Sequence, residues 1–298
     1  MDKKISDRAT QKEWLEFLEK FFLFSGGAFI SLGVMFFIAY NWNELGKFFK
    51  FGLVEFSIVA CVAGYFFTNQ NSLFSKLSLL TSSFLVGVLL ALFGQTYQLQ
   101  ADSWTLFFYW GVLVTPWAIL SRYAIVFLLV VILFNISLYL YTNAYHYNFL
   151  HILIFNTTTL TILLFLLNAL SYAFMEYIQK RFKLFEDNWE KKVLLILIAI
   201  SVINLVINLD NITGFFIGAV VFGFGLWYFF PKKDLFSLGV LYFSLWLYSM
   251  IWLGKILTKF ASFFTFIIPM AALSIFLATF LLNKLKQTHM EIEDAKKA

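Results

Sequence analysis

Long runs of apolar residues fill almost the whole chain, and short polar breaks separate them. A run of about 20 apolar residues with few charges is long enough to cross a bilayer as a helix. Such runs lie near residues 21–40, 48–67, 77–94, 105–120, 124–142, 152–175, 193–209, 212–230, 235–254 and 260–282. The pattern therefore predicts an all-α polytopic membrane protein with about ten transmembrane helices, a number that allows two five-helix halves.

An amphipathic segment precedes the first run. Thr10 with Glu13 fits a capping box, and Trp14, Leu18 and Phe21 recur beyond it at helical spacing. One interpretation is an N-terminal interfacial amphipathic helix that lies in the plane of the membrane surface. The other is a helix that continues directly into the first span.

The basic residues predict an orientation. When the ten runs alternate across the membrane, all but four of the 22 Lys and Arg residues fall on one side. Because cytoplasmic loops carry an excess of Lys and Arg, we expect a multi-pass protein of the cell inner membrane with cytoplasmic N- and C-termini. The predicted segments are a cytoplasmic tail with the interfacial helix (1–20), a first five-helix half (21–142), a sixth span (143–175), a charged cytoplasmic loop (176–192), a four-helix remainder (193–282) and a cytoplasmic tail (283–298).

The composition excludes several classes of protein. With 61% hydrophobic and 13% charged residues, the chain cannot be a soluble enzyme with an ordinary surface. The single cysteine, Cys61, allows no disulfide within the chain, and there is no arginine-rich patch for nucleic acid. The chain has no HExxH, P-loop or G-x-S-x-G motif, and the spacing of His146 and His151 does not place them on one helix face. We therefore expect no catalytic residue, no metal site and no cofactor.

Glu55 is the only carboxylate that this map places well inside a span, roughly 10 Å deep at 1.5 Å per residue. An ionisable residue at that depth is a candidate functional site, and the alternative is a structural partner of a neighbouring helix. Other polar and aromatic residues share the same outer side: Asn41, Trp42, Gln95, Tyr97, Gln98, Asp102, Trp104, Asn156, Asn204 and Asn208. Together they predict either an outward-facing, ligand-binding polar cavity or a set of interhelical hydrogen bonds.

Four lysines oppose the orientation rule and lie on the outer side: Lys47, Lys50, Lys255 and Lys259. Their long side chains could reach the phosphates of the outer leaflet. The alternative hypothesis is that they flank the mouth of the cavity and attract an anionic group.

Two motifs in the first half are fairly specific. Ala39-Tyr40-Asn41-Trp42-Asn43-Glu44 ends the first span, and Gly94-Gln95-Thr96-Tyr97-Gln98 precedes Ala101-Asp102-Ser103-Trp104. Through these motifs, residues 25–142 resemble a bacterial inner-membrane family, the domain-of-unknown-function family twenty-one fifty-seven. The resemblance implies a polytopic membrane protein and supplies no activity or catalytic residue.

Two functions fit these patterns. The first is binding or translocation of an envelope solute or lipid-linked anion through the outward-facing cavity around Glu55, because ten spans with both termini inside is a layout of inverted-repeat carriers. The second is a non-transporting scaffold or assembly subunit of a membrane complex. An intramembrane enzyme is disfavoured because paired catalytic groups are lacking. The expected partners are membrane lipids, with another envelope membrane protein as a further candidate and no nucleic acid.

Overall fold

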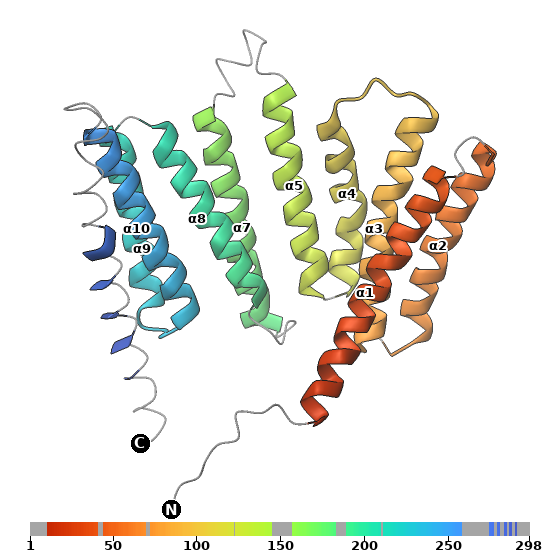
Figure 1. Ribbon diagram of the computed structural model, residues 1–298, viewed down its shortest axis with the longest axis horizontal. Helices are drawn as coiled ribbons and strands as arrows, with labels where there is room; N and C mark the ends of the chain where they lie inside the picture. Colours follow the sequence, from red (N-terminus) through yellow and green to blue (C-terminus); the bar gives the residue numbers. More distant parts are fainter. Residues whose placement is uncertain are drawn as a thin grey trace, which may run out of the picture. The chain divides into compact units, whose positions relative to one another are not determined.

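The computed structural model describes residues 11–40, 44–69, 72–121, 123–144, 157–182, 189–209 and 211–257, with short pieces at 274–276, 279–280, 283–284, 286–287 and 290. Within these ranges the chain is helical or lies in short turns, and it contains no strand. The helices are α1 (Gln11–Tyr40), α2 (Lys47–Phe67), α3 (Leu73–Thr96), α4 (Ser103–Ser121), α5 (Ala124–Ala144), α7 (Thr157–Phe182), α8 (Trp189–Asn208), α9 (Asn211–Phe229) and α10 (Leu235–Leu257) (Figure 1). The all-α prediction is confirmed for this part of the chain.

Seven helices contain a stretch long and apolar enough to cross a membrane. These stretches are Phe17–Tyr40, Lys47–Phe67, Leu73–Thr96, Ser103–Ser121, Ala124–Thr142, Thr157–Arg181 and Leu235–Trp252. In addition, α9 has a shorter apolar stretch, Phe216–Phe229, whereas α8 begins with the charged residues Glu190, Lys191 and Lys192. The tenth expected span, 260–282, lies mostly outside the described residues. The fold is therefore that of a polytopic membrane protein with several apolar helices.

The N-terminal amphipathic segment and the first span form one helix. α1 runs without a break from Gln11 to Tyr40, and Trp14, Phe17 and Phe21 are exposed on its first turns. Its 30 residues correspond to about 45 Å at 1.5 Å per residue, which exceeds a hydrocarbon core of about 30 Å. The structure thus shows direct continuation and not a separate interfacial helix.

The chain divides into two compact units, Met1–Tyr141 and Thr142–Ala298. In the first unit, α3 packs against α1, α2 and α4. Small residues permit this close packing: a Cβ atom on Gly87 would lie 2.5 Å from the ring of Trp110, and the indole N–H of Trp110 donates to the carbonyl of Ser83 at 2.8 Å. α3 is therefore the central helix of this unit.

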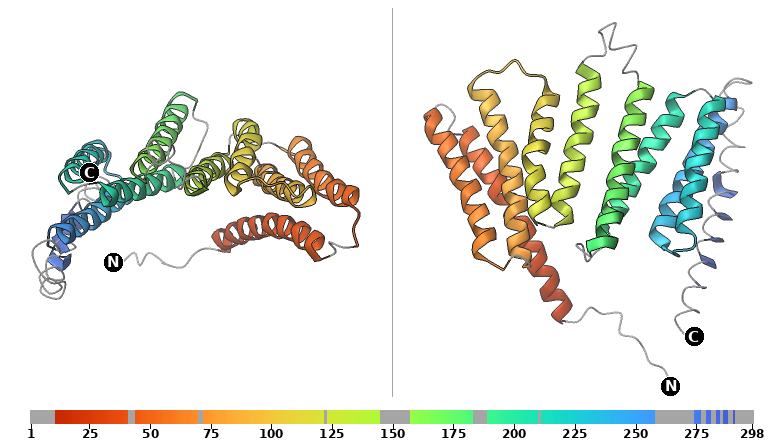
Figure 2. Two further views of the ribbon diagram at one scale, coloured as in Figure 1. Left: turned by 90° about the horizontal axis from the view of Figure 1, so that it is seen from above. Right: turned by 180° about the vertical axis from the view of Figure 1, so that it is seen from behind.

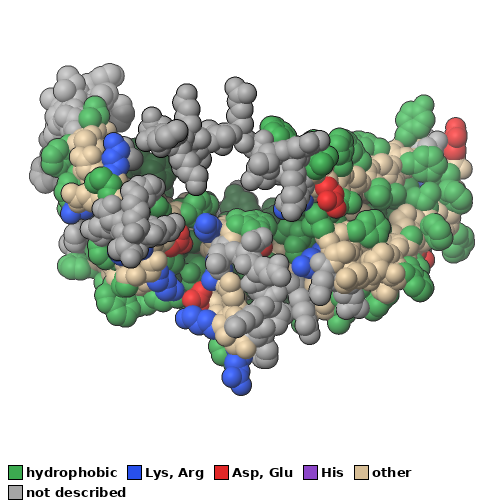
Figure 3. Space-filling model, turned by 90° about the horizontal axis from the view of Figure 1, so that it is seen from below, with side chains coloured by type: hydrophobic (Ala, Val, Ile, Leu, Met, Phe, Trp, Pro, Cys, Tyr) green, Lys and Arg blue, Asp and Glu red, His purple; other side chains and the backbone are tan. Residues whose placement is uncertain are grey.

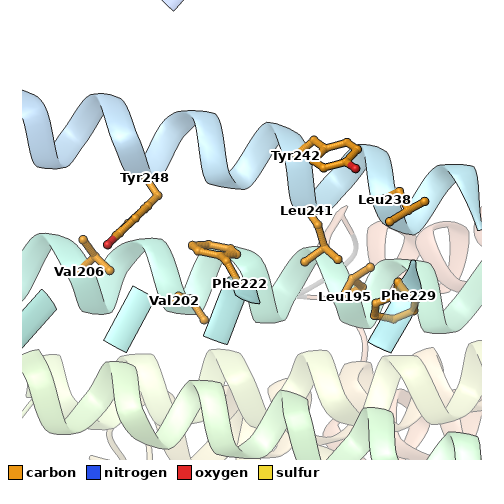
Figure 4. Close-up of a cluster of buried hydrophobic side chains, with 9 residues drawn as sticks. All are labelled: Leu195, Val202, Val206, Phe222, Phe229, Leu238, Leu241, Tyr242 and Tyr248. Atoms are coloured by element: carbon orange, nitrogen blue, oxygen red, sulfur yellow. The ribbon is translucent and has the colours of Figure 1, made fainter. Parts of the chain in front are cut away.

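In the second unit the central helix is α8, which packs against α7, α9 and α10. Its Leu195, Val202 and Val206 form a buried core with Phe222 of α9 and Leu241 of α10, among others (Figure 4). α7 and α9 share no comparable packing with each other within the described residues. The ends of α7 and α9 and the beginnings of α8 and α10 all lie at one end of the unit (Figures 1 and 2).

The segment expected to form a charged loop from residue 176 begins as helix. α7 continues to Phe182, seven residues beyond the expected end of the sixth span at residue 175. Glu176 and Lys180 form an i,i+4 ion pair, and Lys180 and Arg181 place positive charge at the carboxyl end of the helix. Both features stabilise helical structure, because they pair side chains one turn apart and offset the helix dipole.

Candidate functional site

Among the described residues of the first unit, Glu55 shares no hydrogen bond or ion pair with Gln95, Tyr97, Gln98, Asp102 or Trp104. The Glu55 side chain is exposed on α2, and no hydrogen bond or ion pair joins it to another described residue. A cavity of about 410 Å³ lies between α1, α2 and α3, and it is lined by Phe56 and Ser57 but not by Glu55. A site built on Glu55 therefore stays a prediction.

The Gly-Gln-x-Tyr-Gln motif forms the end of α3. The ring of Tyr97 contacts that of Phe51 on α2 at 6.2 Å between centroids, whereas the side chains of Gln95, Gln98 and Asp102 are exposed. Gln98 adopts a positive φ of 47° as the chain turns toward α4. The motif therefore joins α3 to the beginning of α2 rather than to Glu55.

Trp104 belongs to a second contact within the same unit. Its ring lies edge-on to Tyr141 at 5.0 Å, and its carbonyl accepts a hydrogen bond from the Ser137 hydroxyl at 3.0 Å, so it ties α4 to α5. Asn204 and Asn208 are exposed on α8 in the other unit, where the Asn208 amide donates to the Asn204 carbonyl at 2.9 Å. Asn41, Trp42, Asn156 and Lys259 lie outside the described residues.

The remaining outer lysines have different surroundings. Lys47 is exposed, with its ammonium 5.5 Å from the centre of the Phe48 ring, whereas Lys50 is buried. The ammonium of Lys255 donates to the carbonyls of Val206, Ile207 and Leu209 at 2.6, 2.8 and 3.0 Å. Lys255 therefore caps the carboxyl end of α8, where carbonyl groups lack partners within the helix.

A cluster that the sequence interpretation missed lies at the opposite end of this unit. The Glu176 carboxylate, 15% exposed, pairs with three ammonium groups: Lys191 at 2.8 Å, Lys180 at 3.2 Å and Lys232 at 3.4 Å. The Tyr228 hydroxyl donates to the same carboxylate at 3.2 Å. Figure 3, which views this end of the helices, shows basic and acidic side chains together on the surface of the unit. We call these five residues the Glu176 cluster.

Aromatic rings link the Glu176 cluster to α9. The Lys232 ammonium lies 3.6 Å from the centre of the Tyr228 ring, within cation–π range, and Tyr172 of α7 contacts Phe229 at 6.2 Å. Burial alone would lower the pKa of Lys232, but the Tyr228 hydroxyl and the charge of Glu176 raise it above the ordinary lysine value. Lys232 therefore stays protonated at neutral pH.

The turn between α9 and α10 positions Lys232. Lys233 adopts a positive φ of 50°, and the Asp234 carboxylate then accepts hydrogen bonds from the Phe236 amide at 3.2 Å and the Ser237 hydroxyl at 2.6 Å. These contacts are typical of an acidic residue at a helix N-terminus. Because Asp234 is held by the first turn of α10, Glu176 is the carboxylate that directly pairs with Lys232.

Two cavities meet at the Glu176 cluster. One, of about 510 Å³, extends between α7 and α9 and is lined mainly by apolar residues, including Phe165, Ala169, Ala173, Val221 and Phe222. The other, of about 350 Å³, is lined by Tyr172, Glu176, Lys191, Lys192, Phe229, Lys232, Asp234 and Ser237. Tyr172, Glu176 and Phe229 line both cavities. We call the first cavity the apolar cleft and the second the polar pocket.

The packing around α8 explains the apolar cleft. Because α7 and α9 both pack on α8 but not comparably on each other, a space is left between them. At its charged end this space is bridged by the Tyr172–Phe229 and Glu176–Tyr228 contacts. The arrangement can accommodate a molecule that has an apolar part beside a polar part. The polar pocket is lined by three lysines and two carboxylates, so its net charge is positive.

Residues 3–127 match a family model described as "Predicted membrane protein (DUF2157)", which confirms the family resemblance for this part of the chain. The match contains both sequence motifs and ends before α7, so it does not include the Glu176 cluster. Comparisons with curated proteins and with solved structures found no match.

Proposed function

We propose that this membrane protein binds an amphiphilic molecule between α7 and α9, with its chain in the apolar cleft and its head in the polar pocket. The observation that carries this proposal is that Tyr172, Glu176 and Phe229 line both cavities. A ligand with one apolar and one polar part can therefore contact both without crossing an intervening wall.

The size and lining of the apolar cleft support this assignment. Its volume of about 510 Å³ falls within the range of roughly 300–1,000 Å³ found for small-molecule sites. The walls are provided by side chains such as Phe165, Val221 and Phe222, with small residues Ala169 and Ala173 leaving space on α7. For a ligand that comes from the bilayer, van der Waals packing against these walls favours binding of its acyl chain.

The orientation of the site follows from the charge distribution. The Glu176 cluster lies in the region that the sequence assigns to the cytoplasmic side, with Lys180, Lys191 and Lys232 among the basic residues of that side. We propose that the protein lies in the inner membrane with ten spans and cytoplasmic termini, and that the ligand enters from the cytoplasmic leaflet. Solute passage through an outer cavity at Glu55 is a separate hypothesis that these contacts do not require.

Photocrosslinking tests the binding site. The full-length protein, reconstituted in lipid nanodiscs, is irradiated with a phospholipid that carries a diazirine in its acyl chain, and labelled peptides are identified by mass spectrometry. We expect preferential labelling of α7 and α9 residues that line the apolar cleft. The comparison is with exposed apolar residues elsewhere, such as Phe56 on α2 and Phe243 on α10.

A matched pair of variants separates the cleft from the general lipid surface. Ala173→Phe fills the apolar cleft from an exposed position on α7, whereas Leu170→Phe enlarges an exposed residue of the same helix that does not line it. We expect Ala173→Phe to abolish the preferential labelling and Leu170→Phe to preserve it. Labelling spread evenly over all exposed helices, or unchanged in both variants, would reject the proposed function.

A further inference from the structure

We infer that the head of the bound amphiphile carries a phosphate group, held by Lys191, Lys192 and Lys232 in the polar pocket. This inference rests on the proposed function and specifies its ligand. Three ammonium groups line the polar pocket, and its two carboxylates are Glu176 and Asp234. The Asp234 carboxylate already accepts hydrogen bonds from the first turn of α10.

The charge balance of the Glu176 cluster favours an anion. One carboxylate is shared by Lys180, Lys191 and Lys232, all within 3.4 Å, so the cluster itself carries a net positive charge. An ammonium group has three N–H donors, and the side-chain hydrogen bond of Lys191 among the described residues goes to Glu176. Lys191 can therefore keep its bond to Glu176 and donate to a ligand oxygen as well.

The side-chain exposures indicate which lysines hold the ligand. Lys191 is 17% exposed and Lys232 is 39% exposed, whereas Lys180 is 70% exposed and does not line the polar pocket. Partly buried charges are screened less by salt than exposed ones, so Lys191 and Lys232 provide the stronger attraction. Glu176 is then a positioning residue, because it fixes both ammonium groups at the pocket.

Phosphate fits this arrangement better than a carboxylate. It presents several anionic oxygens that separate lysines can share, and it is the anion that membrane lipids place beside their acyl chains. The polar pocket lies near the carboxyl end of the apolar stretch Thr157–Arg181, where we expect the lipid phosphates of that leaflet. The Tyr228 hydroxyl, 3.2 Å from Glu176, adds a polar group at the same site.

The test compares head groups in the photocrosslinking assay with the acyl chains held constant. Unlabelled phosphatidic acid, phosphatidylglycerol, phosphatidylcholine, diacylglycerol and a free fatty acid compete with the probe, and glycerol 3-phosphate serves as a phosphate without a chain. We expect phosphatidic acid and phosphatidylglycerol to compete roughly tenfold better than diacylglycerol, since each lysine adds attraction to an anionic head. Glycerol 3-phosphate should compete only weakly, because it cannot fill the apolar cleft.

The double variant Lys191→Met/Lys232→Met should remove this head-group preference while cleft labelling persists. The control is Lys20→Met, an exposed lysine on α1 in the other unit, which should leave the preference unchanged. Equal competition by diacylglycerol, or best competition by the fatty acid, would overturn the phosphate assignment and leave the cleft as an amphiphile site. Strong competition by glycerol 3-phosphate would assign the pocket to a soluble phosphate and overturn the lipid head group. Absence of preferential cleft labelling would instead reject the proposed function itself.

Discussion

Replacing Lys255 with methionine tests whether one side chain fastens α10 to the carboxyl end of α8. Methionine keeps an apolar stem of similar length and removes the ammonium that donates to the carbonyls of Val206, Ile207 and Leu209. These carbonyls lie where the helix dipole places partial negative charge. The substitution therefore removes three hydrogen bonds and one favourable charge interaction together.

The magnitude follows from these contacts. A hydrogen bond to a charged group contributes about 1.5–3 kcal/mol when buried, and a cation at a helix carboxyl end contributes about 0.3–2 kcal/mol. Because Lys255 is partly exposed and one ammonium serves all three carbonyls, the terms do not add fully, and we expect a loss of about 2–4 kcal/mol. At roughly 2–4 °C per kcal/mol for a unit of this size, the unfolding midpoint should fall by roughly 5–15 °C.

The assay is thermal unfolding of the purified full-length protein in detergent, followed by intrinsic tryptophan fluorescence. Lys47→Met is the matched control, because its exposed ammonium contacts only the Phe48 ring among the interactions described. We expect the control midpoint to stay close to that of the parent protein. An unchanged midpoint for Lys255→Met would refute the capping role and would return Lys255 to the hypothesis of an anion-attracting outer lysine.

Three further outcomes are expected. Gly218→Ala should lower the free energy of unfolding by about 1–3 kcal/mol in the same assay, because its Cβ would overlap the buried ring of Tyr248. The control Gly223→Ala should be neutral or slightly stabilising, because nothing lies within 4 Å of the added Cβ. Equal effects of the two substitutions would contradict this packing. A reporter enzyme that works only in the cytoplasm should be active when it is fused after Met290, and one that works only in the periplasm should be inactive. Activity of the periplasmic reporter would exclude the proposed orientation. The raised pKa of Lys232 means that its contribution to stability is complete below the ordinary lysine value of 10.5 and is lost as pH rises beyond it. Thermal unfolding midpoints measured from pH 7 to 11 should therefore fall less steeply at the alkaline end for Lys232→Met than for the parent protein. Identical pH profiles for the two proteins would show that protonated Lys232 does not contribute to stability.

The apolar pattern predicts the helices well because twenty-residue hydrophobic runs and polar breaks are local features. It places Glu176 in a loop because a charged residue after an apolar run resembles a helix end, although pairing with Lys180 extends α7 by nearly two turns. The i,i+4 spacing of Glu176 and Lys180 is the sequence feature that indicates a continuing helix. The contacts to Lys191 and Lys232 join residues 15 and 56 positions away, so only the packing of α7, α8 and α9 brings them together.

For Glu55, the sequence indicates the depth in the helix but not the face of the helix on which the side chain lies. Depth within a span is a one-dimensional measure, and it does not distinguish the face of a helix that meets protein from the face that meets lipid. Two residues one position apart illustrate this, because Val54 is fully buried and Glu55 is exposed. The Asn204 and Asn208 pair likewise shares one helix face, as the spacing predicts, but that face is exposed.

The central position of α8 has a consequence for biosynthesis. Its partners α9 and α10 follow it along the chain, so α8 is synthesised before two of the three helices that pack against it have been made. Its first turn carries Glu190, Lys191 and Lys192, and such charged side chains disfavour placing that end in an apolar environment. Lys232 and the first turn of α10 are synthesised still later. A ribosome-bound chain that stops after α8 therefore carries Glu176 and Lys191 without the α9 wall, and the proposed ligand site is completed only when the last helices of the unit have folded against α8.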